Sequence, residues 1–342
     1  MDKRSSLLAA ALVAAAPFSA GIAQSLPATV TVTAKAETAP VGTAADDAAD
    51  DPAIWRNRRD PAASLIVATD KKAGLYVYGL DGGVRQFLPD GRLNNVDLID
   101  MGRAGVIVVA SDRNDLAMAK LRLYRLDTRA QRLVPLGTVE GGAGEAYGVC
   151  LARRGRQLDV YSVLKHGVVA QVRVKLNPVP SGVIVRRLTM ASQTEGCVVD
   201  PRSETLYVGE EDLGIWAFDA RANQPATGKL VAPVDGRHLV ADVEGLALAP
   251  KGRRGGWLIA SSQGDNAYAL YSLPDLRPAG RFRIAAGAIG ATEETDGIAL
   301  VLGSFGKDYP AGLFVAQDGQ NAPAAQNFKL VSWRDVLGAL GK

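Results

Sequence analysis

The chain has 342 residues, of which 47% are hydrophobic and 22% charged, and its formal net charge is +3. This balance excludes a disordered chain, and the absence of Lys/Arg runs with interleaved aromatic residues argues against nucleic acid as a partner. Closed all-β folds of this length often form one domain, and no Pro/Ser-rich linker divides the chain, so we expect a single domain.

The N-terminus has the features of a secretory signal peptide. A charged start at Asp2-Lys3-Arg4 is followed by an apolar run over residues 7–18 and by the small residues Gly21-Ile22-Ala23. The apolar run is too short to span a bilayer. We therefore expect a signal peptide over 1–23, a flexible lead over 24–45, a secreted or periplasmic protein, and no membrane partner.

A short motif then recurs through the chain, with one or two polar residues, a Gly in most copies, and an apolar run. Its six start positions are separated by 44, 52, 48, 49 and 52 residues. A fixed period in this range is typical of solenoids and β-propellers. The copies begin at Asp51, Asn95, Tyr147, Glu195, Glu244 and Asp296.

The residues within each period favour a propeller. Short runs rich in Val, Ile, Leu and Tyr, bounded by Gly, Asp, Asn or Pro, indicate strands, and four short strands per period match the spacing of propeller blades. No helical apolar stripe of useful length is present between residues 50 and 326. We predict an all-β fold, a six-bladed β-propeller over residues 46–342. The clearest strand runs are 75–78, 106–110, 206–208, 257–260 and 313–316.

Cys150 and Cys197 are the only cysteines. They stand at different offsets from the motif Gly, so we expect their side chains to point differently and to remain two buried thiols. Cys150 also begins a Cys-x5-Arg match that ends at Arg156, the spacing of cysteine-dependent phosphatases. That match is weak, because Cys150 lies in a strand pattern with no helix start to hold a phosphate.

Carboxylates recur at one phase of the repeat, which a propeller would bring together at its central channel. Such carboxylates repel one another unless a cation lies among them. Hard oxygen ligands suit Ca²⁺, whereas the presence of only two histidines argues against a zinc site built from histidines. The residues concerned are Asp50, Asp51, Glu195, Glu210, Glu211, Asp242, Glu244, Glu294 and Asp296, with Gln263 as a further oxygen donor.

The ordered series of motifs resembles the β-propeller phytases from about residue 46 to residue 333. Asp50-Asp51-Pro52-Ala53-Ile54-Trp55 is the most specific of them. The others are Leu93 to Asp97, Ser192 to Gly196, Glu210 to Asp212, Asp235 to Leu239, Asp242 to Leu246, Ser261 to Gly264, Glu294 to Gly297 and Gln326 to Lys329.

The resemblance implies a calcium-dependent phosphoric monoester hydrolase of the 3-phytase type. Its substrate would be phytate, taken as a calcium complex by a monomer, and water activated by calcium would attack phosphorus. Phosphate-contacting positions correspond to Lys71, Arg113, Tyr147 and Lys165. Catalytic calcium ligands correspond to Asp50, Glu195, Glu210 or Glu211, Asp242, Glu244, Gln263 and Asp296, and structural calcium ligands to Asp51, the Val96 carbonyl, Asp318 and Asn321.

Three departures from the family pattern leave the affinity for a second phosphate and peripheral calcium sites open. Ile99 replaces a common Arg, His166 replaces a common acidic residue, and the segment before Glu293 is rich in Ala and Gly. The alternatives are a calcium-dependent propeller lactonase or esterase and a noncatalytic periplasmic binding propeller. Lys71, Arg113 and Lys165 argue against both, because neither function needs cations facing the carboxylates.

Overall fold

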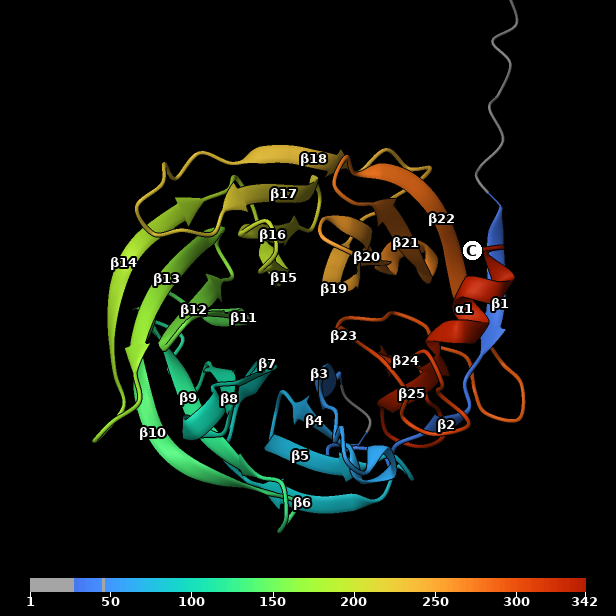
Figure 1. Cartoon of the computed structure of the whole chain (residues 1–342), viewed down its shortest axis with the longest axis horizontal. Helices are drawn as coiled ribbons and strands as arrows, with labels where there is room; N and C mark the ends of the chain where they lie inside the picture. Colours follow the sequence, from blue (N-terminus) through green and yellow to red (C-terminus); the bar gives the residue numbers. More distant parts are fainter. Residues whose placement is uncertain (1–27, 45–46) are drawn as a thin grey trace, which may run out of the picture.

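The computed structural model describes residues 28–44 and 47–342, and it forms six blades around a central channel (Figure 1). The six-bladed propeller predicted from the repeat is therefore confirmed. Each of the first four blades is a four-stranded antiparallel sheet whose first strand lies nearest the channel. The predicted signal peptide, residues 1–23, lies outside the described residues.

Consecutive strands fill the first four blades in chain order. Blade 1 contains β3 (Ala49–Trp55), β4 (Leu65–Asp70), β5 (Gly74–Gly79) and β6 (Val84–Leu88). Blade 2 contains β7 (Leu93–Asp100), β8 (Val106–Asp112), β9 (Met118–Asp127) and β10 (Arg132–Ala143). Blade 3 contains β11 (Ala146–Arg154), β12 (Gln157–Leu164), β13 (Val168–Lys175) and β14 (Ser181–Thr189). Blade 4 contains β15 (Thr194–Asp200), β16 (Thr205–Glu210), β17 (Gly214–Asp219) and β18 (Lys229–Pro233).

The last two blades each take an outermost strand from the N-terminal segment. Blade 5 contains β19 (Val243–Lys251), β20 (Gly255–Ser262), β21 (Ala267–Ser272) and β22 (Arg277–Ala285), and β1 (Thr29–Thr33) pairs parallel to β22. Blade 6 contains β23 (Ile298–Leu302), β24 (Gly312–Asp318) and β25 (Asn327–Ser332), and β2 (Ala36–Glu37) pairs with β25. These pairings join the two ends of the chain and cover two sheet edges.

The expectation of a flexible lead over residues 24–45 is wrong for β1 and β2. Both strands are hydrogen-bonded into sheets, so the propeller includes residues ahead of position 46. The alternation Thr-Val-Thr-Val-Thr at 29–33 is itself a strand pattern that signals this pairing.

The helical elements are few and short. A helix, α1 (Trp333–Ala339), follows β25 and buries Trp333 and Val336 against blades 5 and 6. Short 3₁₀ turns occur at Pro61–Ala63, Gly102–Ala104 and Gln263–Asp265. Within the described residues, no helix has the length and apolar character that crossing a bilayer requires.

The hydrophobic core lies between the facing sheets of neighbouring blades. Between blades 3 and 4, for example, Tyr161, Val163 and Val169 pack with Leu206 and Val208. Because the side chains of a strand alternate between its two faces, each blade contributes one set of apolar residues to the blade before it and the other set to the blade after it.

Cys150 and Cys197 form a disulfide, with their Cα atoms 5.7 Å apart, so the expectation of two free thiols is wrong. Cys150 lies on the face of β11 that packs toward blade 4, and Cys197 lies on the face of β15 that packs toward blade 3. Side chains from opposite faces meet when one blade packs on the next. The different offsets from the motif Gly, which argued against pairing, are what bring the two sulfur atoms together.

Candidate functional site

The recurring motif forms a β-bulge at the start of the innermost strand in five blades. The register between the first and second strands shifts after Ala49, Leu93, Ala146, Thr194 and Val243. A bulge inserts an extra residue and redirects side chains from the sheet. The residues released in this way are Asp50, Asp51, Asn94, Asn95, Tyr147, Gly148, Glu195, Gly196, Glu244 and Gly245, and they lie near the N-terminal ends of the innermost strands.

The glycine of the motif is required by the close approach of neighbouring innermost strands. A Cβ on Gly196 would collide with the carbonyl of Glu244, and a Cβ on Gly245 would lie 2.6 Å from the backbone nitrogen of Ile298. The Gly245 N–H donates to the Asp296 carbonyl at 2.8 Å. The bulges of successive blades are thus linked through their backbones, which fixes the side chains that project from them.

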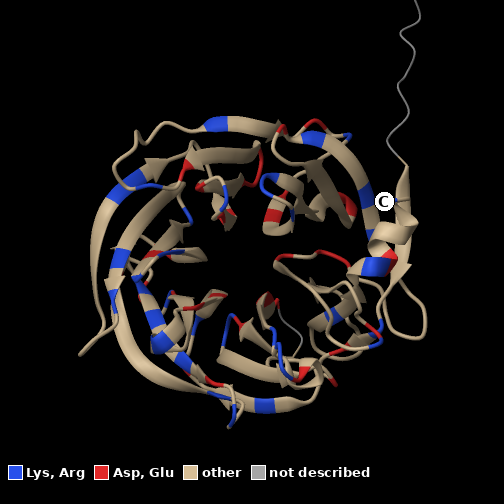
Figure 2. Cartoon of the chain, viewed as in Figure 1, with Lys and Arg blue, Asp and Glu red and all other residues tan. Residues whose placement is uncertain are grey.

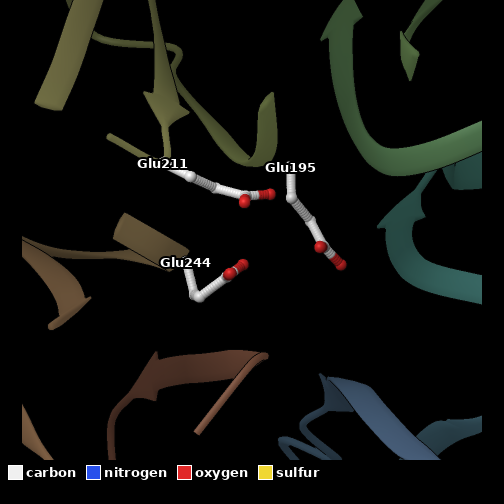
Figure 3. Close-up of side chains that lie close together, drawn as sticks. All are labelled: Glu195, Glu211 and Glu244. Atoms are coloured by element: carbon white, nitrogen blue, oxygen red, sulfur yellow. The ribbon is translucent and has the colours of Figure 1, made fainter. Parts of the chain in front are cut away.

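Three carboxylates meet where blades 4 and 5 approach the channel (Figure 3). One oxygen each of Glu195, Glu211 and Glu244 lies within 4.8 Å of the others, and all three residues are buried. Burial raises the pKa values of Glu195 and Glu244 well above the usual range, and Asp50 and Asp296 raise them further. Burial also raises the pKa of Glu211.

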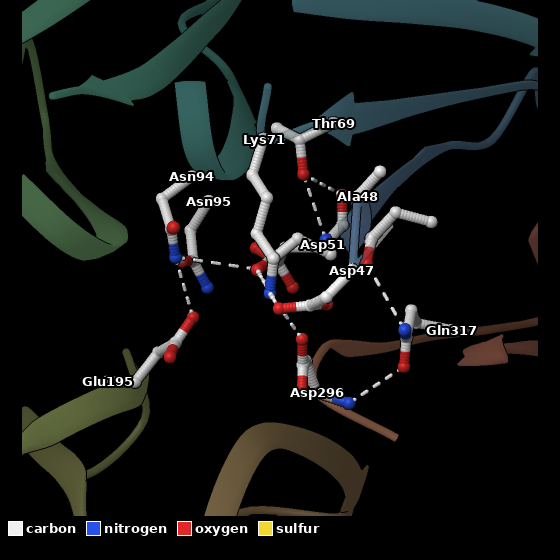
Figure 4. A network of polar contacts seen from close by, with 12 residues as sticks. Asp47, Ala48, Asp51, Thr69, Lys71, Asn94, Asn95, Glu195, Asp296 and Gln317 are labelled. Carbon is white, nitrogen blue, oxygen red and sulfur yellow. Dashed lines mark hydrogen bonds and ion pairs between the residues drawn. The ribbon is translucent and has the colours of Figure 1, made fainter. Parts of the chain in front are cut away.

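Lys71 joins this cluster to the carboxylates of blades 1 and 6 (Figure 4). Its Nζ lies 3.0 Å from Asp50 Oδ2, 2.9 Å from Asp296 Oδ2 and 2.8 Å from Asp47 Oδ2. Burial opposes the ammonium charge, but the three carboxylates outweigh it and raise the pKa of Lys71. Burial raises the pKa of Asp296 to about 7, with Asp50 adding to the effect.

Further polar groups complete the wall around these carboxylates. Asn94 Nδ2 donates to Glu195 Oε1 at 2.8 Å, and Gln263 Nε2 donates to Asp296 Oδ1 at 2.7 Å. Burial, with a contribution from Asp212, raises the pKa of Asp242. Figure 2 shows acidic residues at the inner ends of several blades around the channel.

Asp51 and Val96, predicted to share a structural ion, do lie together. The Val96 N–H donates to Asp51 Oδ2 at 3.1 Å. Burial, together with Asp50, raises the pKa of Asp51 well above its usual range. Asp97 lies beside them, and burial raises its pKa to about 7.

The cations Arg113 and Lys165 flank the ring of Tyr147. The Arg113 guanidinium carbon lies 5.9 Å and the Lys165 Nζ 5.1 Å from the ring centroid, both within cation–π range. Glu145 holds Arg113 at 3.3 Å. Gln193 Nε2 donates to the Tyr147 hydroxyl at 3.3 Å and to Glu211 Oε2 at 2.8 Å. The phosphate-contacting candidates therefore adjoin the carboxylate cluster.

Glu210 and Glu211, which the sequence left as alternatives, have different roles. Glu210 accepts from the backbone N–H and hydroxyl of Ser192 at 2.6 and 2.8 Å and from Trp216 Nε1 at 2.7 Å, so both of its oxygens are occupied within blade 4. Glu211 projects from the end of β16 toward Glu195 and Glu244 (Figure 3). The structure therefore assigns Glu211, and not Glu210, to the cluster.

Asp318 and Asn321 are brought together around a lysine of the same chain. The fully buried Lys329 Nζ lies 3.0 Å from Asp318 Oδ2 and 3.0 Å from Asn321 Oδ1. Glu37 on β2 and Asn327 on β25 complete its shell. Because an ammonium and a calcium ion would need the same oxygens, we leave Asp318 and Asn321 out of the metal set proposed below.

The site suits a hard cation. Glu211 Oε1, Glu244 Oε2 and Asn94 Oδ1 are buried oxygens without a hydrogen-bond partner among the described residues. Buried polar atoms are normally paired, so unpaired acceptors on two carboxylates of the cluster and on the neighbouring Asn94 are consistent with a bound cation or water. An all-oxygen donor set of carboxylates and amides is the kind that Ca²⁺ prefers.

A polar cavity of about 760 Å³ opens next to the cluster, lined by Asp47, Gln263, Asp296 and the loop 319–326. This volume is within the range of small-molecule sites. Its lining contains acidic and amide groups but no cation. Lys71 pairs with two of these acidic groups, Asp47 and Asp296, and a bound metal ion would further favour an anionic ligand.

Sequence reasoning missed several residues that shape the site. Asp47 and Glu145 lie in connecting segments, outside the repeated motif and the family motifs. Asn94, Asp97 and Gln193 belong to family motifs, but only their contacts in the folded protein indicate a role.

The chain is similar to known proteins over most of its length. The family model described as Phytase matches residues 3–342. The 3-phytase of Bacillus subtilis (strain 168) is 37% identical to this chain over 330 residues, a match that covers 91% of this chain and 86% of the relative.

Proposed function

The chain belongs to the phytase family, and on this premise we propose that it hydrolyses phytate, myo-inositol hexakisphosphate, to lower inositol phosphates and phosphate with bound calcium. The fold, the family and the carboxylate cluster all support this activity. The 3-phytase type is that of the Bacillus subtilis relative.

The main support for a calcium requirement is the excess of negative charge at the channel mouth. Six carboxylates face three candidate phosphate-binding cations, Lys71, Arg113 and Lys165. Because phytate is itself a polyanion, its approach to this wall needs additional positive charge. The proposed ligands are Asp50, Glu195, Glu211, Asp242, Glu244, Gln263 and Asp296 for catalytic ions, and Asp51 with the Val96 carbonyl for a structural ion.

Calcium bound there would lower the pKa of a coordinated water and neutralise charge on phosphate oxygens. The protein's own cations then position the substrate. The planar guanidinium of Arg113 can hold two phosphate oxygens, whereas Lys71 and Lys165 act as point charges. Gln193 and Glu145 fix the Tyr147 hydroxyl and Arg113 respectively, so these side chains lose little freedom when phosphate binds.

A covalent phosphocysteine pathway is not part of this proposal. Cys150, the start of the Cys-x5-Arg match, is bonded to Cys197 and has no thiolate to attack phosphorus. Water is the nucleophile that remains consistent with the site.

We also propose that the protein is exported and acts as a monomer, with residues 1–23 serving as its signal peptide. The disulfide supports export, because such bonds persist in oxidising compartments. Phytate would be taken as its calcium complex, since the ions would serve both partners.

Phosphate release from phytate and from an aryl phosphate, each with and without calcium, tests the function. We expect calcium-dependent release from phytate in preference to the aryl phosphate. Equal release from both substrates would indicate a general phosphatase. Hydrolysis of a lactone or carboxylic ester without phosphate release would indicate the lactonase alternative, and no hydrolysis at all would indicate a binding propeller.

A further inference from the structure

The six turns that join the innermost strand of each blade to the second strand lie at the end of the propeller opposite the bulges. We call them the inner turns: residues 56–64, 101–105, 155–156, 201–204, 252–254 and 303–311. Every inner turn contains at least one Lys or Arg, and together they contain nine basic and three acidic residues. The two ends of the channel thus differ in the sign of their charge.

Most of these basic residues are available to a partner. Arg202 pairs with Asp200, and Arg56 donates to the Ser304 carbonyl. The other seven side chains are exposed, and none has an ion pair or hydrogen bond among the described residues. They are Arg58, Arg59, Arg103, Arg156, Arg253, Arg254 and Lys307.

The acidic residues of the inner turns do not balance this charge. Glu204 is held by Arg154 at 2.8 Å, which leaves Asp60 and Asp308 as exposed carboxylates. Seven free cations and two free carboxylates give the ring of inner turns a local charge of seven minus two, or +5. The outer turns at the same end carry Asp81, Arg129, Arg221 and Asp275, whose charges cancel.

The arrangement of these cations indicates the shape of the partner. They are spread over five of the six blades at one end of a disc, so only a broad, flat anionic surface could contact them together. The exposed residues of the inner turns include no aromatic side chain, which argues against single-stranded nucleic acid. A cavity of about 570 Å³ in the channel next to the inner turns is mainly apolar. Arg202 is the one cation in its lining and already pairs with Asp200, so this cavity offers no binding site for a small anion.

We propose that the inner turns dock the protein on an anionic lipid bilayer. Clusters of about 4–8 basic residues are sufficient for such attraction. The catalytic mouth would then face away from the bilayer, toward the aqueous phase that supplies a polyanionic substrate. The absence of a membrane span, which led us to expect no membrane partner, does not bear on peripheral docking of this kind.

Vesicle co-sedimentation tests the proposal with phosphatidylcholine alone and with an equal mixture of phosphatidylcholine and phosphatidylglycerol, without added calcium. The double variant Arg103→Glu/Arg156→Glu reverses two cations in adjacent inner turns. Its control, Lys120→Glu/Arg187→Glu, makes the same change of net charge at exposed, unpaired positions on β9 and β14. Melting temperature and phytate hydrolysis establish that both variants remain folded.

We expect the parent to bind the anionic vesicles selectively and to release them as salt is raised. Each basic residue near such a surface changes partition roughly fivefold, so the inner-turn variant should bind at least roughly thirtyfold more weakly. The control variant should bind nearly as the parent does.

Four results would overturn the proposal. Equal binding to neutral vesicles would show that charge is not the cause, and equal weakening of both double variants would show that net charge alone matters. Loss of binding in Lys71→Ala or Arg113→Ala would place the lipid at the catalytic mouth. Tight binding of double-stranded DNA without vesicle binding would identify a different class of partner.

Discussion

Lys71 Nζ lies 2.9 Å from Asp296 Oδ2, although 225 residues separate the two in the chain. The contact joins blade 1 to the segment that enters blade 6, and the same ammonium also reaches Asp50 and Asp47. The lysine that the family resemblance assigns to phosphate is therefore also a counter-ion of the proposed metal ligands. Arg113 differs, because its ion pair is with Glu145, outside that set.

This difference predicts that the two lysine and arginine variants, Lys71→Ala and Arg113→Ala, will differ in calcium binding. Lys71→Ala removes a positive charge from the carboxylates, so it should lower turnover but reduce the calcium concentration needed for half-maximal binding. Arg113→Ala should lower turnover without that shift, and it serves as the control. Calcium titration by calorimetry, with phytate kinetics alongside, checks both. Weaker calcium binding in Lys71→Ala would contradict the counter-ion role.

The buried carboxylates predict how stability depends on pH. Burial raises the pKa of Asp296 to about 7 and raises those of Glu195 and Glu244, whereas unfolded carboxyls titrate near pH 4. Without metal, the stability contributed by these groups is full below about pH 4 and is lost as pH rises through about 7. With calcium the trend reverses, because ligands must be ionised to bind metal.

Melting temperatures in chelator and in calcium, measured between about pH 5 and pH 8, check this prediction. We expect the chelated protein to lose stability across the range and the stabilisation by calcium to grow. Activity should accordingly fall in acid. A chelated protein whose melting temperature rose steadily to about pH 8 would exclude the assigned titration.

We expect removal of the disulfide to lower the stability of the protein without lowering its phytate turnover. Cys150→Ala/Cys197→Ala removes a cross-link between residues 47 apart, and such links contribute about 2–4 kcal/mol. Denaturant unfolding should show this decrease, while phytate turnover at low temperature should stay near that of the parent. Intact stability with lost turnover would point to a chemical role for a cysteine.

We expect the free energy of unfolding to depend strongly on the buried charge of Lys329. Lys329→Met leaves the Asp318 carboxylate, 2% exposed, without its cation, and breaking a buried pair costs about 3–5 kcal/mol. Lys35→Met is the control, because its pair with Asp335 is partly exposed and should contribute less than about 1 kcal/mol. Equal unfolding free energies for the two variants would contradict the assigned shell.

Much of the fold could be predicted because each copy of the repeated motif corresponds to the start of one blade. The motif glycines mark close backbone contacts and the polar residues mark bulges, so the blade number followed from the spacing. The strands expected at 75–78, 106–110, 206–208, 257–260 and 313–316 all lie within β5, β8, β16, β20 and β24. The role of β1 and β2 was missed because both strands lie outside the blade repeat, although residues 29–33 alternate as a strand does.

The site was harder to predict wherever it depends on contacts between blades. Adjacent sequence positions such as Glu210 and Glu211 cannot be told apart until the end of β16 is known. The disulfide was missed because the different offsets of the two cysteines from the motif Gly were taken to mean that their side chains point apart. In the folded protein, side chains on opposite faces of neighbouring blades point toward each other. The contact of Lys329 with Asp318 and Asn321 was missed because nothing in its sequence context reveals full burial.

The calcium dependence of phytate hydrolysis by Glu244→Gln, compared with Glu210→Gln, tests the central claim most directly. Both substitutions remove one buried carboxylate, but only Glu244 belongs to the cluster that would hold the ion. Glu244→Gln should lower kcat at least about a hundredfold and raise the calcium requirement, because the ion supplies both nucleophile and charge stabilisation. Glu210→Gln should melt at a lower temperature but keep the parental calcium requirement. Phytate hydrolysis by Glu244→Gln at the parental rate and calcium requirement would contradict the assigned active site.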